Sequence, residues 1–161
     1  MHEHRIRIVD FDAEDHDRIE QAARLLVAAF AEHWPRAWSD HAAARAEVHD
    51  ALQVEKINRI AVDDADTLLG WIGGISQYDG HAWELHPLAV DPAAQGRGIG
   101  RALVADLEQQ VKTRGGSTIF LGTDDEDGMT TLADTDLYPN VFEHVVRIRN
   151  LRGHPYEFYQ K

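Results

Sequence analysis

The stretch LHPLAVDPAAQGRGIGRALVADLEQ, residues 85–109, carries the strongest structural signal in this chain. An apolar strand that ends near Val90 is followed by a helix over residues 98–114, whose apolar side chains recur at helical spacing. The segment QGRGIG, residues 95–100, joins the two. A helix N-terminus presents unpaired N–H groups and the positive end of the helix dipole, and glycines leave room there for an anion. The sequence therefore predicts a phosphate-binding loop between a strand and a helix.

Two other glycine-rich phosphate-binding patterns do not fit this segment. A P-loop needs a Lys-Ser/Thr pair after its last glycine, and none follows here. The dinucleotide-binding pattern Gly-x-Gly-x-x-Gly needs a glycine where the chain has Arg101 or Leu103. The pattern Gln/Arg-x-x-Gly-x-Gly/Ala, which binds the pyrophosphate of coenzyme A, is met by Gln95, Gly98 and Gly100. The alternative is a tight turn without a ligand, but the flanking strand and amphipathic helix favour the coenzyme A loop.

Composition and charge restrict the class of protein. A chain of 161 residues, 43% of them hydrophobic, suits a single domain over residues 1–161 with one core. The formal net charge of −12 argues against a nucleic-acid partner, because phosphates need a basic surface. The absence of cysteine excludes a disulfide scaffold and a thiol nucleophile. No apolar run reaches the roughly 18 residues of a membrane helix, and no signal peptide is recognisable. We therefore expect a cytoplasmic protein without a membrane partner.

The order of predicted elements is β-α-α-β-β-β-α-β-α-α, which indicates a mixed α/β fold built in layers. Alternating apolar residues predict strands over residues 5–9, 57–62, 68–76, 83–90 and 117–121. Helical spacing predicts helices over residues 15–31, 40–54, 98–114 and 141–148. Ser39 is the predicted cap of the second helix, and Pro155 is expected to open a short last helix.

Residues 85–109 resemble the core of the GCN5-related N-acetyltransferase (GNAT) superfamily. Three further stretches are similar to the family of aminoglycoside 6′-N-acetyltransferases. They are WIGGISQYDGHAWELHPLAV, residues 71–90; FLGTDDEDGMTTL, residues 120–132; and NLRGHPYEFYQK, residues 150–161. The resemblance implies a central mixed, mostly antiparallel, twisted sheet flanked by helices, in which the fourth and fifth strands splay apart.

The same resemblance implies acetyl-CoA as co-substrate and assigns residues to it. The pantetheine arm would fill the gap between the splayed strands, beside Leu88, Ala89 and Val90. Backbone N–H groups of the glycine-rich loop would hold the pyrophosphate, and two arginines would add positive charge in an acidic protein. The loop residues implied in coenzyme binding are Gln95, Gly96, Arg97, Gly98, Ile99, Gly100 and Arg101.

Acetyl transfer to an amine needs a general acid and a general base. The resemblance places the acid at Tyr159, within Phe158-Tyr159-Gln160-Lys161; the alternative is an aromatic core residue. An alkylammonium with a pKa of roughly 10.4 is only about one part in a thousand neutral at pH 7, so a carboxylate that removes its proton aids the reaction. Glu84, on the strand before the loop, is the predicted base, with His86 as the alternative. Strand alternation puts both on one face. Either residue can instead be an ordinary polar side chain at a strand edge.

Candidate acceptor-binding residues lie in two places. Trp34 and Trp38 fall between the two helices that cover the acceptor in the superfamily, where their rings can stack on a sugar. Asp124 and Asp125 follow a strand that ends near the acceptor site and suit a polycation, although a solvated loop is the alternative. Residues 123–134 imitate a calcium loop, but without the bidentate glutamate or the paired helices. The histidines form no recognisable ligand set, so we expect no metal.

The predicted function is acetyl transfer from acetyl-CoA to a primary amine, by direct attack in a ternary complex. The resemblance favours the 6′-amino group of an aminoglycoside, which would confer antibiotic resistance. Another small amine or an amino sugar is the alternative, and a non-catalytic coenzyme A-binding or regulatory module is a different class. The expected partner is a small cationic amine, and a homodimer is possible.

The chain also ends early relative to the superfamily pattern. There the helix that carries the tyrosine is followed by two more strands, whereas this sequence stops at Lys161. The C-terminal strands are therefore expected to be missing, to belong to a longer chain, or to be replaced by a partner.

Overall fold

The computed structural model of the chain describes residues 5–160. The observed order of strands and α-helices is the predicted one, so the α/β assignment is confirmed. The chain forms two compact units, Met1–Leu121 and Gly122–Lys161. A single acetyltransferase domain over residues 1–161 stays a prediction.

The first unit is built on a five-stranded sheet in the order β1-β2-β3-β4-β5. Neighbouring strands are antiparallel from β1 to β4, and β4 and β5 are parallel, which gives the mixed sheet that the resemblance implies. The strands are β1 (Arg7–Asp10), β2 (Lys56–Val62), β3 (Leu68–Gln77), β4 (Ala82–Val90) and β5 (Thr118–Phe120). Two short 3₁₀ turns, η1 (Tyr78–Gly80) and η2 (Pro92–Ala94), precede and follow β4.

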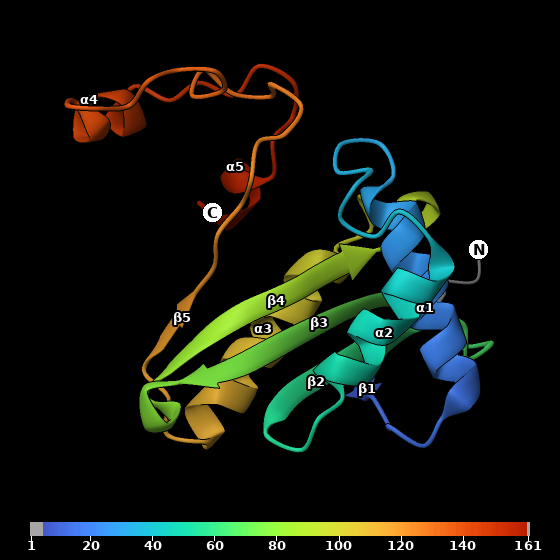
Figure 1. Cartoon of the computed structure of the whole chain (residues 1–161). Helices are drawn as coiled ribbons and strands as arrows, with labels where there is room; N and C mark the ends of the chain where they lie inside the picture. Colours follow the sequence, from blue (N-terminus) through green and yellow to red (C-terminus); the bar gives the residue numbers. More distant parts are fainter. Residues whose placement is uncertain (1–4, 161) are drawn as a thin grey trace. The chain divides into compact units, whose positions relative to one another are not determined.

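Three helices cover the sheet. Figure 1 shows α1 (His16–Phe30) and α2 (His41–Ala51) in front of the sheet and α3 (Ile99–Thr113) behind it. The side chain of Asp40, rather than the predicted Ser39, caps α2 by accepting a hydrogen bond from the Ala43 N–H at 2.8 Å. Ser39 and Asp40 are both good capping residues, and Asp40 takes the position because the first helical residue is one place later than predicted.

Apolar side chains fill both faces of this sheet. On the α1–α2 side, the core includes Leu26, Val48 and Trp71, all fully buried, and the Trp71 indole N–H donates to Asn58 Oδ1 at 3.0 Å. On the α3 side, the buried residues recur at helical spacing, as the amphipathic pattern predicted. They are Ile99, Leu103, Leu107 and Val111. The sheet with α3 therefore forms a rigid support for the loop before α3.

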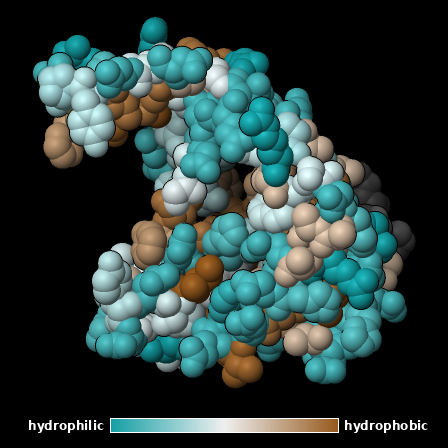
Figure 2. Space-filling model, viewed as in Figure 1, coloured by the Kyte–Doolittle hydropathy of each residue, from teal (hydrophilic) through white to brown (hydrophobic). Residues whose placement is uncertain are grey.

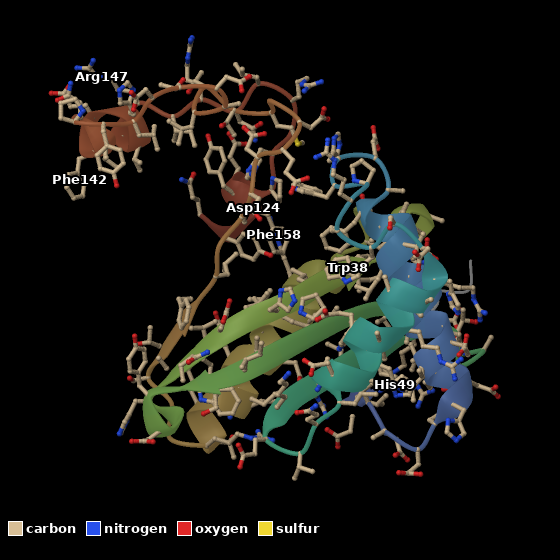
Figure 3. The ribbon with its side chains drawn as sticks, viewed as in Figure 1. Trp38, His49, Asp124, Phe142, Arg147 and Phe158 are labelled. Carbon is tan, nitrogen blue, oxygen red and sulfur yellow. The ribbon has the colours of Figure 1, made fainter. Side chains whose placement is uncertain are left out.

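The second unit contains two short helices, α4 (Val141–Val146) and α5 (Tyr156–Tyr159). An isolated antiparallel bridge joins Thr130 to Asn150 and brings the loop after β5 next to the segment before α5. Met129, on this loop, is buried, whereas Phe142 on α4 is 86% exposed. Figure 3 labels Phe142 on α4 and Arg147, the residue that follows this helix.

Much of the visible surface is hydrophilic (Figure 2), in keeping with the net charge of −12. Among the helices of residues 5–160, none has both the length and the apolar character needed to cross a membrane.

Candidate active site

The N-terminus of α3 presents a cradle for an anion. Gly98 is the residue that precedes the helix, and its φ of +82° is in the left-handed region that favours glycine. The first N–H with a partner inside the helix is that of Ala102, which donates to the Gly98 carbonyl at 3.1 Å. The N–H groups of Ile99, Gly100 and Arg101 therefore precede the helical hydrogen-bond ladder and are available to a ligand.

The space in front of this helix end is open. A Cβ on Gly96 or Gly98 would meet no atom of the described residues within 4 Å, chain neighbours aside. Arg97 in the loop and Arg101 in the first turn of α3 are both exposed. Bare backbone, open space and positive charge are what a pyrophosphate requires, so the residues present fit the coenzyme that the sequence predicted.

Hydrogen bonds connect the segment before α3 to the ends of β3 and β4. The Asp91 N–H donates to the Leu69 carbonyl at 2.9 Å, and Asp91 Oδ1 accepts from the Ala93 N–H at 2.9 Å. The Gln95 side-chain amide donates to the Val90 carbonyl at 3.4 Å. Gln95 thus has a structural partner at the end of β4, and its contact with the coenzyme stays a prediction.

The parallel pair β4–β5 is short. Its register runs from Ala82–Thr118 to Glu84–Phe120, where the pairing ends. Among the described residues, β4 beyond Glu84 is paired with β3 alone, so Leu88-Ala89-Val90 has one strand edge without a sheet partner. Such an edge offers backbone groups to an extended ligand, as β-strand addition requires. The pantetheine arm is predicted to bind at this edge, and its contact with these residues stays a prediction.

The strand β4 also carries an irregularity at the predicted catalytic positions. Its pairing with β3 passes from Gly74–Leu85 to Ile72–Leu88, so two residues of β4, His86 and Pro87, stand opposite one residue of β3. A bulge of this kind redirects side chains next to a binding site. The predicted alternation nevertheless holds, because Leu85 and Pro87 are buried whereas Glu84 is half-buried and His86 exposed.

Glu47 on α2 reaches His86 from above the sheet. Its Oε1 lies 3.3 Å from His86 Nε2. The hydrogen bond from His86 lowers the pKa of the Glu47 carboxyl, and the same bond raises the pKa of His86, with the Glu47 and Glu84 charges adding to that rise and burial opposing it. Sequence reasoning did not find Glu47, because a lone glutamate on a helix gives no sign of its partner.

The two tryptophans between α1 and α2 differ in their surroundings. Trp38, labelled in Figure 3, contacts the Phe30 ring at 4.7 Å between centroids and lies 6.2 Å from the His86 ring. Trp34 contacts Phe30 at 5.9 Å and His33 at 5.7 Å. Trp38 is thus next to the predicted catalytic strand, and its stacking on a substrate stays a prediction.

The predicted acidic residues of the second unit have distinct roles within it. Asp125 accepts three hydrogen bonds, from the Met129 N–H at 2.7 Å and from the N–H and hydroxyl of Thr130 at 2.8 and 2.7 Å. Burial opposes ionisation, but these bonds outweigh it and lower the pKa of Asp125. Asp125 therefore organises its loop. The backbone carbonyl of Asp124 accepts a hydrogen bond from His154 Nε2 at 3.0 Å. The side-chain carboxylate of Asp124 takes no part in this bond.

Tyr159 is the last residue of α5. Burial raises the pKa of its phenol above the ordinary value of 10.0, so the hydroxyl stays protonated at neutral pH, as a proton donor must. The Phe158 ring packs edge-on against it at 4.9 Å. Lys161, the end of the predicted Phe158–Lys161 pattern, lies outside the described residues.

A buried histidine connects the acidic loop to α5. His154 is 4% exposed; its Nε2 meets the Asp124 carbonyl, and its Nδ1 accepts from the Tyr156 N–H at 3.2 Å. Asn150 brackets His154 by accepting from its N–H at 2.8 Å and donating to its carbonyl at 2.9 Å. Both ring nitrogens thus serve backbone groups, so His154 has a structural role that sequence reasoning did not assign.

Comparisons with known proteins agree with this geometry. The acetyltransferase (GNAT) family model matches residues 19–131, and the chain belongs to that family. It is an N-acetyltransferase similar to aminoglycoside 6′-N-acetyltransferases. None of the curated protein sequences searched gives a significant match. Within residues 5–160, no group of three or more His, Cys, Asp or Glu side chains is arranged to hold a metal ion.

Three solved structures are similar over nearly the whole chain. An aminoglycoside 6′-N-acetyltransferase complexed with coenzyme A is 44% identical, with a TM-score of 0.87 over 96% of this chain and 82% of that one. The aminoglycoside 6′-N-acetyltransferase from Enterococcus faecium is 43% identical, with a TM-score of 0.82 over the same shares of the two chains. An aminoglycoside 6′-acetyltransferase type Ii is 36% identical, with a TM-score of 0.71 over 96% of this chain and 79% of that one.

Proposed function

We propose that this enzyme transfers the acetyl group of acetyl-CoA to the 6′-amino group of an aminoglycoside. The observation that carries the proposal is the cradle at the α3 N-terminus beside the unpaired edge of β4, in a chain 44% identical to an aminoglycoside 6′-N-acetyltransferase complexed with coenzyme A. Modification of such an antibiotic would confer resistance on the cell that contains the enzyme.

The donor is held by backbone groups. The N–H groups of residues 97–101 bind the pyrophosphate at the positive end of the α3 dipole. The free edge at Leu88–Val90 pairs with the pantetheine arm. The side chains of Arg97 and Arg101 neutralise part of the phosphate charge. Because these groups are fixed by the fold, they bind the donor without much rearrangement.

The acceptor enters as an ammonium ion and must lose a proton before its nitrogen can attack. At pH 7 the neutral fraction of an amine with a pKa of roughly 10.4 is about one in a thousand, which adds about 4–5 kcal/mol to the barrier. Glu84 removes this proton, directly or through a water molecule. The nitrogen then attacks the thioester carbonyl in the ternary complex, and Tyr159 protonates the leaving sulfur.

The acidic character of the protein suits a polycationic acceptor. A net charge of −12 attracts polyamines over a distance limited by salt. Trp34 and Trp38 supply aromatic faces for sugar rings, and Asp124 supplies a carboxylate for an ammonium group. Asp125 contributes by keeping the acidic loop in shape.

The test is turnover of acetyl-CoA with a matched pair of aminoglycosides, one with an amino group and one with a hydroxyl at the 6′ position. We expect coenzyme A release and a mono-acetylated product with the first compound alone. Equal turnover with both would show that another amine is the acceptor. If both are inert, a panel of small diamines and amino sugars tests the second candidate, which the same donor site also allows.

A further inference from the structure

The side chains of Glu47 and His86 come together from elements that are far apart in the sequence. Glu47 belongs to α2 and His86 to the irregular part of β4, and their side chains are 28% and 44% exposed. The Trp38 ring also lies beside the imidazole of His86. The two ring centroids are 6.2 Å apart, and the two ring planes are tilted by 43°. Trp38 itself packs against the core beneath α1 and α2. The imidazole is thus held by a carboxylate and an aromatic ring.

This pair borders a pocket of about 210 Å³ between α2 and the sheet. Two other charged residues line the same pocket, Asp50 on α2 and Lys56 on β2, and they are bonded to each other at 2.9 Å. The charge of Glu84, on the same strand, adds to the rise in the pKa of the imidazole, and the charge of Lys56 opposes it. The charges that face His86 are therefore Glu47, Glu84, Asp50 and Lys56. Of the two α2 carboxylates, Glu47 alone bonds the ring.

The reaction proposed above releases one proton that needs a route out of the site. The ammonium nitrogen of the acceptor loses two protons as the new C–N bond forms and the C–S bond breaks. One of them ends on the sulfur of coenzyme A, and the other must reach solvent before the next turnover. Glu84 takes this second proton but is less exposed than His86, which lies two residues further along the same face of β4.

We propose that Glu47 is a positioning residue that holds His86 to receive this proton from Glu84 and to pass it to water. The inference rests on the proposed function. The proton moves from the amine nitrogen to the Glu84 carboxylate, then through an intervening water molecule to the imidazole two residues along β4, and then to solvent. When the imidazole of His86 takes up the proton it becomes an imidazolium, and the negative charge of Glu47 stabilises it, as a carboxylate does for histidine bases in general. The raised pKa of His86 makes its neutral imidazole a stronger proton acceptor.

The first test needs no substrate. Replacing Glu47 with Gln keeps the side-chain shape and removes the charge, so the pKa of His86, followed by NMR, should fall toward the ordinary value of 6.5. Asp50→Asn is the matched control, because it removes a carboxylate three positions further along α2 that bonds Lys56 instead of His86. An unchanged His86 titration in Glu47→Gln overturns the proposal.

The second test measures turnover. Glu47→Gln should lower kcat by about 10- to 100-fold, shift the acidic limb of the pH–rate profile to lower pH, and leave the KM for acetyl-CoA unchanged. Asp50→Asn should keep the wild-type profile. His86→Gln provides the same kcat test if Glu47→Gln does not fold. A wild-type profile in both Glu47→Gln and His86→Gln refutes the relay, whereas a wild-type enzyme that acetylates no amine refutes the proposed function itself.

Discussion

Gly73 on β3 lies against the backbone of His86 on β4. A Cβ on Gly73 would be 2.2 Å from the His86 carbonyl oxygen, a distance that no packing arrangement tolerates. The close approach occurs where two residues of β4 stand opposite one residue of β3. A missing side chain on β3 therefore makes room for the bulge that carries a predicted catalytic residue.

Gly73→Ala should push β4 away from β3 at this point. We expect the free energy of unfolding to fall by about 1–3 kcal/mol, the usual cost of overpacking, and kcat/KM to fall with it because Glu84 and His86 are displaced. Gly74→Ala is the matched control. Its Cβ would meet the end of the flexible Leu107 side chain at 2.9 Å rather than backbone. Chemical denaturation and steady-state kinetics measure both effects. A Gly73→Ala enzyme as stable and active as Gly74→Ala would show that the bulge is not needed.

The Glu47–His86 pair should make stability depend on pH within a defined window. The pKa of His86 is raised in the folded protein, so the pair stabilises the fold below the unfolded value of 6.5 and this contribution is lost as pH rises through the folded pKa. The pKa of Glu47 is lowered, so its contribution is present above 4.5 and is lost as pH falls through the folded pKa. The Tm difference between wild type and His86→Gln should therefore be greatest between pH 4.5 and 6.5. A difference that is constant from pH 4 to pH 9 would contradict the pairing.

Glycines at the two ends of α3 allow the effect of backbone strain on stability to be separated from the effect of a side chain on coenzyme A binding. Gly98 before the helix and Gly115 after it both have a φ of +82°, and a Cβ on either meets open space. Valine at either place should cost about 1–2 kcal/mol of stability, because a side chain disfavours the left-handed conformation. At Gly98 alone it should also block the pyrophosphate. Calorimetry should then show coenzyme A binding about 100-fold weaker, since losing two hydrogen bonds to a charged group costs about 3 kcal/mol. Equal affinities in the two variants would place the phosphates elsewhere.

Neighbouring carboxylates in the loop after β5 should give separable phenotypes. Asp125→Asn places an amide among the N–H and hydroxyl donors of Met129 and Thr130 and should increase hydrogen exchange at both amides. Asp124→Asn keeps the backbone carbonyl that His154 bonds and the three bonds that Asp125 accepts, so exchange at the Met129 and Thr130 amides should change less than in Asp125→Asn. The KM for a polycationic acceptor should rise in Asp124→Asn, and less so at high salt because charge pairs are screened. An Asp124→Asn enzyme with an unchanged KM would move the acceptor surface away from this loop.

Sequence reasoning succeeded where a local pattern determines the structure. Amphipathic spacing located α3, and alternation along β4 correctly separated Glu84 and His86 from the buried Leu85. It failed where the partner is distant: Glu47 lies 39 positions from His86, and nothing in the sequence of α2 connects them. It also could not assign different roles to Asp124 and Asp125, because adjacent acidic residues look alike until their hydrogen bonds are known. The pair Gly73-Gly74 shows the same limit, since only the fold distinguishes a backbone neighbour from a side-chain neighbour.

Tyr159 and Tyr156 occupy the two ends of α5 and provide a test of the general acid. Burial raises the pKa of Tyr159 above 10.0, so its hydroxyl is protonated over the whole working range and no alkaline limb from this group should be seen below pH 10. Tyr159→Phe removes the proton donor and leaves the ring, so kcat should fall by about 100-fold with little change in the Kd of acetyl-CoA.

Tyr156→Phe, the control, makes the same chemical change three positions earlier. Its backbone N–H to His154 Nδ1 is kept, so its kcat should stay close to wild type. Pre-steady-state kinetics that separate chemistry from product release decide the matter, because only a slower chemical step in Tyr159→Phe fits a proton donor. If the chemical step is equally fast in both variants, another group or a water molecule protonates the sulfur.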